Sequence, residues 1–195
     1  MTIRKTVNGN VRRNGERGAS LLELALLLPL LVVLAFGVID LGRLIHARLV
    51  VTNVSREGGS LASRDRGGAN LIAMLQSSAT PFDLSGSQGR IYVTRINAGK
   101  SLAAPLPYIF SIDSGGSYNV SSSIGGNLGQ TPTGVPTTLY NRLIFERAPQ
   151  STSDIAEITV VEVFYHYRPI TPLPNFVQNL FPVSGGILIG SRAIF

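Results

Sequence analysis

The stretch Arg17–Ile39, RGASLLELALLLPLLVVLAFGVI, decides the fold because it is long and apolar enough to cross a membrane. The 19 residues from Leu21 to Ile39 contain a single ionisable side chain, Glu23. At about 1.5 Å per residue, a helix of this length covers roughly 28 Å, close to the bilayer core of about 30 Å. A charge at the membrane centre costs at least about 2.5 kcal/mol, so we expect a partner that offsets the charge of Glu23.

The positive charge of the chain is concentrated before this stretch. The formal net charge is +6, and residues 1–18 hold five Lys and Arg side chains against one acid, Glu16. By the positive-inside rule this leader predicts a cytoplasmic N-terminus and a C-terminal part outside the cytoplasm. The leader also explains the high pI, so the charge gives little support to nucleic-acid binding by residues 19–195. Because the chain has no cysteine, disulfides, thiolate metal sites and a Cys nucleophile are excluded.

Two common kinds of segment share this pattern. One is a cleaved secretory signal, with an apolar region at Leu24–Ala35 and a cleavage site at Val33-Leu34-Ala35. Glu23 and Pro29 argue against it, as does the helix-compatible sequence that follows. The other is an uncleaved signal anchor, in which the Glu23 carboxylate reaches the membrane interface.

The residues around Gly18 favour a third interpretation. A Gly18-Ala19 junction follows the basic leader, and Ser20, two leucines and Glu23 come next. This pattern resembles the type III signal of prepilins, which a membrane peptidase cuts after the glycine. The cut would give Ala19 an α-ammonium group, and a neighbouring subunit in a filament could bring that group close to Glu23. The resemblance therefore implies a processing site at Gly18 and Ala19, and it implies that Glu23 sets the register between subunits, as buried polar residues do in coiled coils.

More specifically, residues 15–65 resemble the TadE-like family, the minor pilins of the tight-adherence (Tad/Flp) pilus. The resemblance implies a minor pilin or pseudopilin, taking part in assembly, initiation or capping of a type IV pilus. It also implies a single-pass protein of the bacterial inner membrane with a periplasmic head, and incorporation in a surface pilus is one outcome. The implied partners are the lipid bilayer, a prepilin peptidase, other pilins and the Tad assembly machinery. The matching residues are Arg17-Gly18-Ala19, Glu23, Pro29, Gly37, Asp40-Leu41-Gly42-Arg43 and Ser55-Arg56-Glu57-Gly58-Gly59.

Pro29 predicts a kink in the apolar helix. Proline removes one backbone hydrogen bond and clashes with the carbonyl of Ala25, at a cost of about 3 kcal/mol in water. Membrane helices tolerate such kinks when neighbouring groups bind the freed carbonyl. The alternative role for Pro29 is a functional bend that lets subunits pack in a filament. After Ile39 the apolar residues recur every three to four positions, which predicts one helix from Leu21 to Ser63.

The remaining sequence predicts an α+β head of the pilin type, with a short helix and about four antiparallel strands. The long segment 111–138 is rich in Gly, Ser, Thr and Pro and is expected to be irregular. Three parts follow: a leader (1–18), a transmembrane and stalk helix (19–66), and an extracytoplasmic head (67–195). The expected elements are a helix at Ala69–Ser78 and strands at Arg90–Asn97, Leu139–Arg147, Glu157–Arg168 and Gly186–Phe195.

The sequence offers little for catalysis. Phe110–Gly115 contains Asp-Ser-Gly, but an aspartic dyad needs a second such motif, so we expect a turn there. His46 and His166 lack the spacing of a metal site. We therefore expect no enzyme, no metal and no cofactor. The alternative function is an unprocessed, membrane-tethered periplasmic binding module that uses the loop 111–138.

Overall fold

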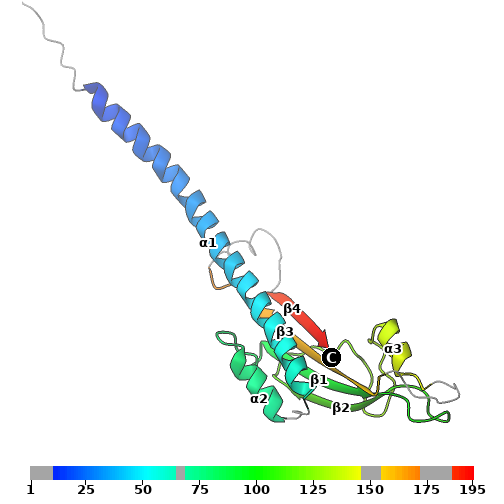
Figure 1. Cartoon of the computed structure of the whole chain (residues 1–195). Coiled ribbons are helices and arrows are strands. Elements are labelled where there is room, and N and C mark those ends of the chain that lie inside the picture. The colour runs from blue at the N-terminus through cyan, green and yellow to red at the C-terminus, as the bar shows by residue number, and fades with distance from the viewer. Residues whose placement is uncertain (1–10, 65–68, 146–154, 172–185) are drawn as a thin grey trace, which may run out of the picture. The chain divides into compact units, whose positions relative to one another are not determined.

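The computed structural model describes residues 11–64, 69–145, 155–171 and 186–195. Within these ranges the chain combines a long helix, two short helices and a four-stranded antiparallel sheet, which confirms the predicted α+β class (Figure 1). The helices are α1 (Val11–Ala62), α2 (Ala69–Ser78) and α3 (Thr137–Leu143). The strands are β1 (Gly89–Asn97), β2 (Tyr108–Gly115), β3 (Glu157–Tyr167) and β4 (Ile187–Ile194).

The chain divides into two compact units, and the boundary falls inside α1. The first unit comprises Met1–Arg43 and Pro169–Ser184, and the second comprises Leu44–Arg168 and Gly185–Phe195. The apolar part of α1 therefore belongs to the first unit. The later part of the same helix belongs to the unit that contains the sheet.

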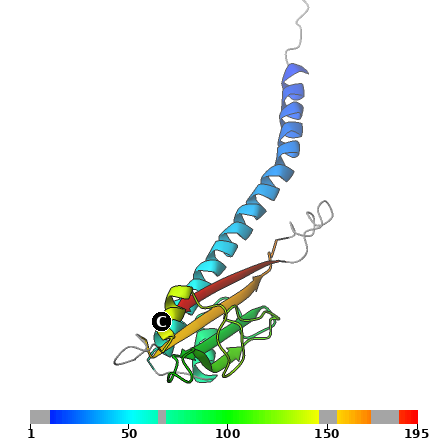
Figure 2. The same cartoon turned by 90° about the vertical axis from the view of Figure 1, so that its right-hand side faces the viewer.

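The sheet of the second unit has the strand order β2-β1-β3-β4, with every neighbouring pair antiparallel (Figure 2). The two central strands pair over their whole shared length, with Val93 opposite Val161. The register of β1 with β2 shifts between Arg95 and Ile96, which marks a bulge. β4 pairs with β3 from Ile187 to Ile194 and forms the opposite edge of the sheet.

Both faces of the sheet are covered, so the second unit has two apolar cores. On one face, residues of α1 from Ala47 onward and the helix α2 pack on the sheet, as Figure 1 shows. On the other face, Ile124 and Leu143 of the segment after β2 pack on Ile109, Ile158 and Val160. This burial on both faces explains why β3 is apolar at nearly every position.

Most of the predicted elements agree with the structure. α2 has the predicted bounds, β1 and β3 differ from prediction by one residue, and β4 lies in the predicted last strand. α1 begins at Val11 rather than Leu21 and ends at Ala62, and Pro29 lies inside it without ending it.

Two predictions were wrong. The strand expected at Leu139–Arg147 is the helix α3 up to Leu143, because Pro136 begins a helical turn in which Leu139 and Tyr140 donate their N–H groups to its carbonyl. Arg147 lies outside the described residues. The turn expected at Phe110–Gly115 is part of β2, so the irregular segment expected from residue 111 begins only after Gly115.

Candidate membrane-spanning and binding sites

Gly18–Ala62 is long and apolar enough to cross a membrane, and it is the one such helix within the described ranges. None of its most apolar window is buried within the protein. Large side chains along the window are exposed, for example Leu26 at 79% and Leu22 at 69%. A soluble protein rarely exposes so continuous an apolar surface, whereas lipid covers it without cost.

The sequence-predicted site residues Gly18, Ala19, Glu23 and Pro29 all lie on this exposed part of α1. A Cβ atom added to Gly18 would meet nothing within 4 Å, so the junction is open on the helix surface. Ala19 and Glu23 are four positions apart and therefore share one helix face, one turn from each other. Pro29 lies further along the helix and does not join this group.

Asp40 forms a contact that the sequence did not predict. Its Oδ1 accepts hydrogen bonds from the backbone N–H of Ile170 at 3.2 Å and of Thr171 at 3.4 Å. Its Oδ2 accepts a hydrogen bond from the Thr171 hydroxyl. The contact fixes the segment after β3 to the end of the apolar part of α1, within the first compact unit.

Glu162 forms a second contact that sequence reasoning missed. Its side chain is only 1% exposed, in the middle of β3. The carboxylate accepts hydrogen bonds from the hydroxyls of Ser122 and Ser123 and from the Ser123 N–H at 3.1 Å. Arg192 of β4 donates to the Ser123 hydroxyl at 3.3 Å and to the Gly134 carbonyl at 3.0 Å. The sequence did contain a signal for this contact: Glu162 is flanked by apolar residues in a predicted strand, and a buried carboxylate needs hydrogen-bond donors.

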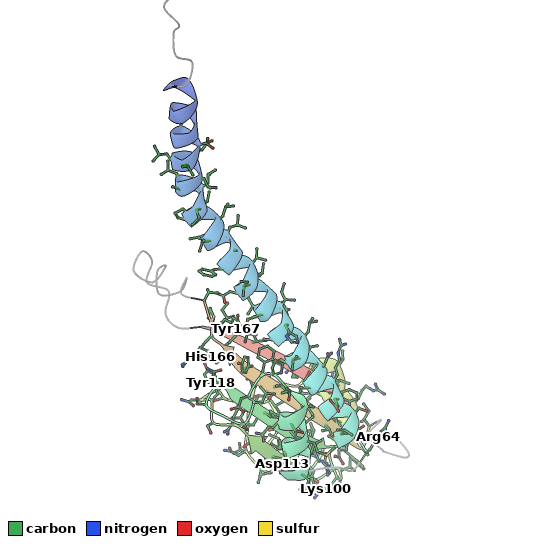
Figure 3. The ribbon with its side chains drawn as sticks, turned by 90° about the vertical axis from the view of Figure 1, so that its left-hand side faces the viewer. Arg64, Lys100, Asp113, Tyr118, His166 and Tyr167 are labelled. Atoms are coloured by element: carbon green, nitrogen blue, oxygen red, sulfur yellow. The ribbon has the colours of Figure 1, made fainter. Side chains whose placement is uncertain are left out.

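These bonds attach the irregular segment 116–136 to the sheet, and beside it lies a groove of about 960 Å³. Lys100 lies at this groove with its Nζ 4.7 Å from the centre of the Tyr108 ring (Figure 3 labels Lys100). The hydrogen bond from Lys100 is the main cause of a lowered pKa of Tyr108. The lining residues are Lys100, Ala103, Ala104, Pro105, Leu106, Pro107, Tyr108, Gly126, Gly129, Gln130, Thr131 and Thr133.

The two histidines lie apart and each contacts an aromatic ring. His46 of α1 meets Phe82 edge to face with ring centres 5.4 Å apart. His166 of β3 stacks on Tyr118 with ring centres 5.1 Å apart, and Figure 3 labels both residues. Where the chain is described, no three His, Asp or Glu side chains lie close enough together to hold a metal ion.

No curated protein and no solved structure matches the chain. The family model described as TadE-like protein matches residues 18–60, which confirms the TadE-like resemblance of the segment that carries Gly18, Glu23 and Asp40.

Proposed function

We propose that this protein is a minor pilin or pseudopilin of a Tad pilus, held in the inner membrane by α1 and acting in assembly, initiation or capping of the filament. The single observation that carries the proposal is that the TadE-like match, over residues 18–60, lies on the exposed apolar helix that is long enough to cross a membrane. The family points to a Tad pilus-associated protein. The more specific role rests on Gly18, Ala19 and Glu23.

Processing after Gly18 is part of the proposal. A peptidase needs access to the backbone on both sides of the cut, and Gly18, Ala19 and Ser20 are all exposed on α1. The small residues at the junction let the enzyme approach the backbone closely. The product would keep the whole apolar helix and begin at Ala19.

The role of Glu23 follows from its charge. No cation pairs with Glu23 among the side chains that the structure describes, which begin at Gly18 in α1, and Glu23 lies in the apolar part of this helix. The new α-ammonium at Ala19 is the charge that cleavage supplies, and an adjoining subunit would bring this group to Glu23. Opposite charges in a medium of low dielectric offset much of each other's desolvation cost.

The test of processing is the intact mass of the protein from the membrane fraction of cells that hold the Tad machinery. We expect a chain that begins at Ala19, and a Gly18→Leu variant that keeps residues 1–18. Gly15→Leu, three residues upstream, is the matched control and should be processed normally. A wild-type chain that begins at Met1 would contradict processing, and one that begins at Phe36 would indicate a secreted domain.

Assembly is tested separately with Glu23→Gln. This variant keeps the side-chain shape and removes the charge, so we expect normal cleavage after Gly18 but fewer surface pili and less of the variant in sheared filaments. Glu57→Gln, an exposed acid further along α1, is the control and should leave both unchanged. Normal piliation with Glu23→Gln would contradict the proposed register role.

The groove beside Lys100 supports a second candidate, an unprocessed membrane-tethered binding module. Its volume of about 960 Å³ is typical of a ligand site, and residues of the irregular segment 116–136 form part of its lining. In that case the chain keeps Met1, Gly18→Leu has no effect, and Lys100→Glu removes the binding of a partner from the cell envelope. No catalytic residue is proposed for either function.

A further inference from the structure

We propose that Pro169–Thr171 forms a second membrane contact, in which Ile170 enters the lipid–water interface beside the end of the apolar part of α1. The inference starts from the three hydrogen bonds that join Asp40 to Ile170 and Thr171. It rests on the proposed membrane anchoring by α1 and adds a contact that α1 itself does not make.

The depth of the contact follows from the position of Asp40. Between Glu23 and Asp40 the chain has no ionisable residue, so Asp40 is the first charge at the outer end of the apolar run. A helix that spans the hydrocarbon core with this run places Asp40 at the boundary with the headgroups. Because the carboxylate binds the N–H groups of Ile170 and Thr171 directly, those residues lie at the same depth.

The backbone of this segment is suited to a water-poor environment. An unpaired N–H group costs several kcal/mol in the hydrocarbon core, so an irregular segment at the edge of this core is favoured when its N–H groups have acceptors. Proline has no N–H, and the segment reads Pro169-Ile170-Thr171-Pro172. Its two N–H groups are therefore those of Ile170 and Thr171, and both are bound by Asp40.

The side chains at this place fit a lipid interface as well. Ile170 is 62% exposed although it is a large apolar residue. The Asp40 carboxylate would be repelled by lipid phosphates, and three donors reduce this cost. Arg43 is exposed one helical turn further from the apolar run, where a cation can bind a phosphate. Pro169, Ile170 and Thr171 themselves carry no charge.

The absence of cysteine allows a direct test with single labels on the full-length chain. Ile170→Cys, Leu34→Cys and Ser87→Cys are each labelled with an environment-sensitive dye in vesicles of phosphatidylcholine and phosphatidylglycerol. Nitroxide lipids with the spin label at shallow or deep positions then quench dyes at matching depths. Leu34 reports the anchoring by α1, and Ser87, exposed before β1, serves as the water control.

We expect Leu34→Cys to be quenched by deep nitroxides and Ile170→Cys by shallow ones, with a blue-shifted emission, while Ser87→Cys stays unquenched. Adding Asp40→Ala should remove the quenching at position 170 and leave that at position 34. A quenched position 34 with an unquenched position 170 overturns this inference and leaves the anchoring intact. Blue-shifted emission at 170 without lipid quenching indicates a protein neighbour and also overturns it.

Two further outcomes complete the test. If the label at position 34 is itself unquenched, the anchoring fails and the inference fails with it. If quenching at position 170 survives Asp40→Ala, Asp40 does not hold the segment at the membrane, and the inference is wrong. Circular dichroism of the Asp40→Ala chain, together with an unchanged Ser87 label, shows that the variant is folded.

Discussion

Ser123 donates its backbone N–H to the carboxylate of Glu162 over 3.1 Å, although 39 positions separate the two residues. The Ser122 and Ser123 hydroxyls bind the same carboxylate, and the Ser122 oxygen accepts the N–H of Ile124 at 3.1 Å. Ile124 is thereby held in the second apolar core. The buried acid thus holds Ser122 and Ser123 on the sheet, while other bonds, such as Tyr118 N–H to the Gly89 carbonyl and Gly129 N–H to the Ile109 carbonyl, attach the rest of the segment.

Replacing Glu162 by Gln should weaken the attachment at Ser122 and Ser123. The variant keeps the volume but loses the charged acceptor, and hydrogen bonds to charged groups contribute about 1.5–3 kcal/mol. We expect the free energy of unfolding to fall by about that amount, with faster amide exchange at Ser123 and Ile124. Chemical denaturation in detergent and mass-spectrometric hydrogen exchange measure the two effects. Glu157→Gln, exposed at the start of the same strand, should leave both unchanged.

Gly116→Ala should be more destabilising than Gly129→Ala. Both glycines have positive φ, +85° and +79°, so each alanine pays about 1–2 kcal/mol for the left-handed conformation. At Gly116 the added Cβ would also lie 2.2 Å from the Gly89 carbonyl oxygen, whereas at Gly129 it meets nothing within 4 Å. Thermal unfolding of the two variants measures how much stability each substitution removes. Equal destabilisation would mean that the β1 backbone can move away.

Sequence periodicity predicted the elements whose side chains alternate or repeat regularly. β1 and β3 lie at the centre of the sheet, so their apolar positions are dictated by burial. β2 was missed because it is an edge strand with Ser, Asp and Gly in its second half, and its pairing with β1 outweighs its weak propensity. The apolar pattern from Leu139 is compatible with a strand or with a helix. Pro136 begins a helical turn, and the segment therefore forms the helix α3.

The hydrogen bonds of Asp40 and of Glu162 could not be predicted from the sequence, because their partners are distant in the chain. The residues around Gly18 are adjacent in the chain, so their pattern could be recognised directly. Asp40 and Thr171 are 131 positions apart, and only the fold brings them together. Glu162 was visible as an acid in an apolar strand, but its partners Ser122 and Ser123 lie among many other serines.

Asp83 should titrate below its usual pKa of 3.8. The hydroxyl and then the N–H of Ser85, with the N–H of Gly86, bind its carboxylate and lower the pKa. Since the folded value lies below the unfolded one, the stabilisation is complete above pH 3.8 and is lost as the pH falls through the lowered value. Nuclear magnetic resonance of the carboxyl carbon measures the pKa. Ser85→Ala should raise it, whereas Ser87→Ala should not.

Pro29→Ala should strengthen α1 where it crosses the membrane. Proline leaves the Ala25 carbonyl without its helical N–H donor, and alanine at position 29 would supply that donor and favour the helix. We therefore expect slower amide exchange at residues 30–33 in micelles, with membrane insertion retained. Leu30→Ala, which changes a side chain without adding an N–H, is the control and should leave the exchange unchanged. Unaltered exchange in Pro29→Ala would mean that the Ala25 carbonyl already has another donor, as happens when neighbouring groups satisfy a proline kink in a membrane helix.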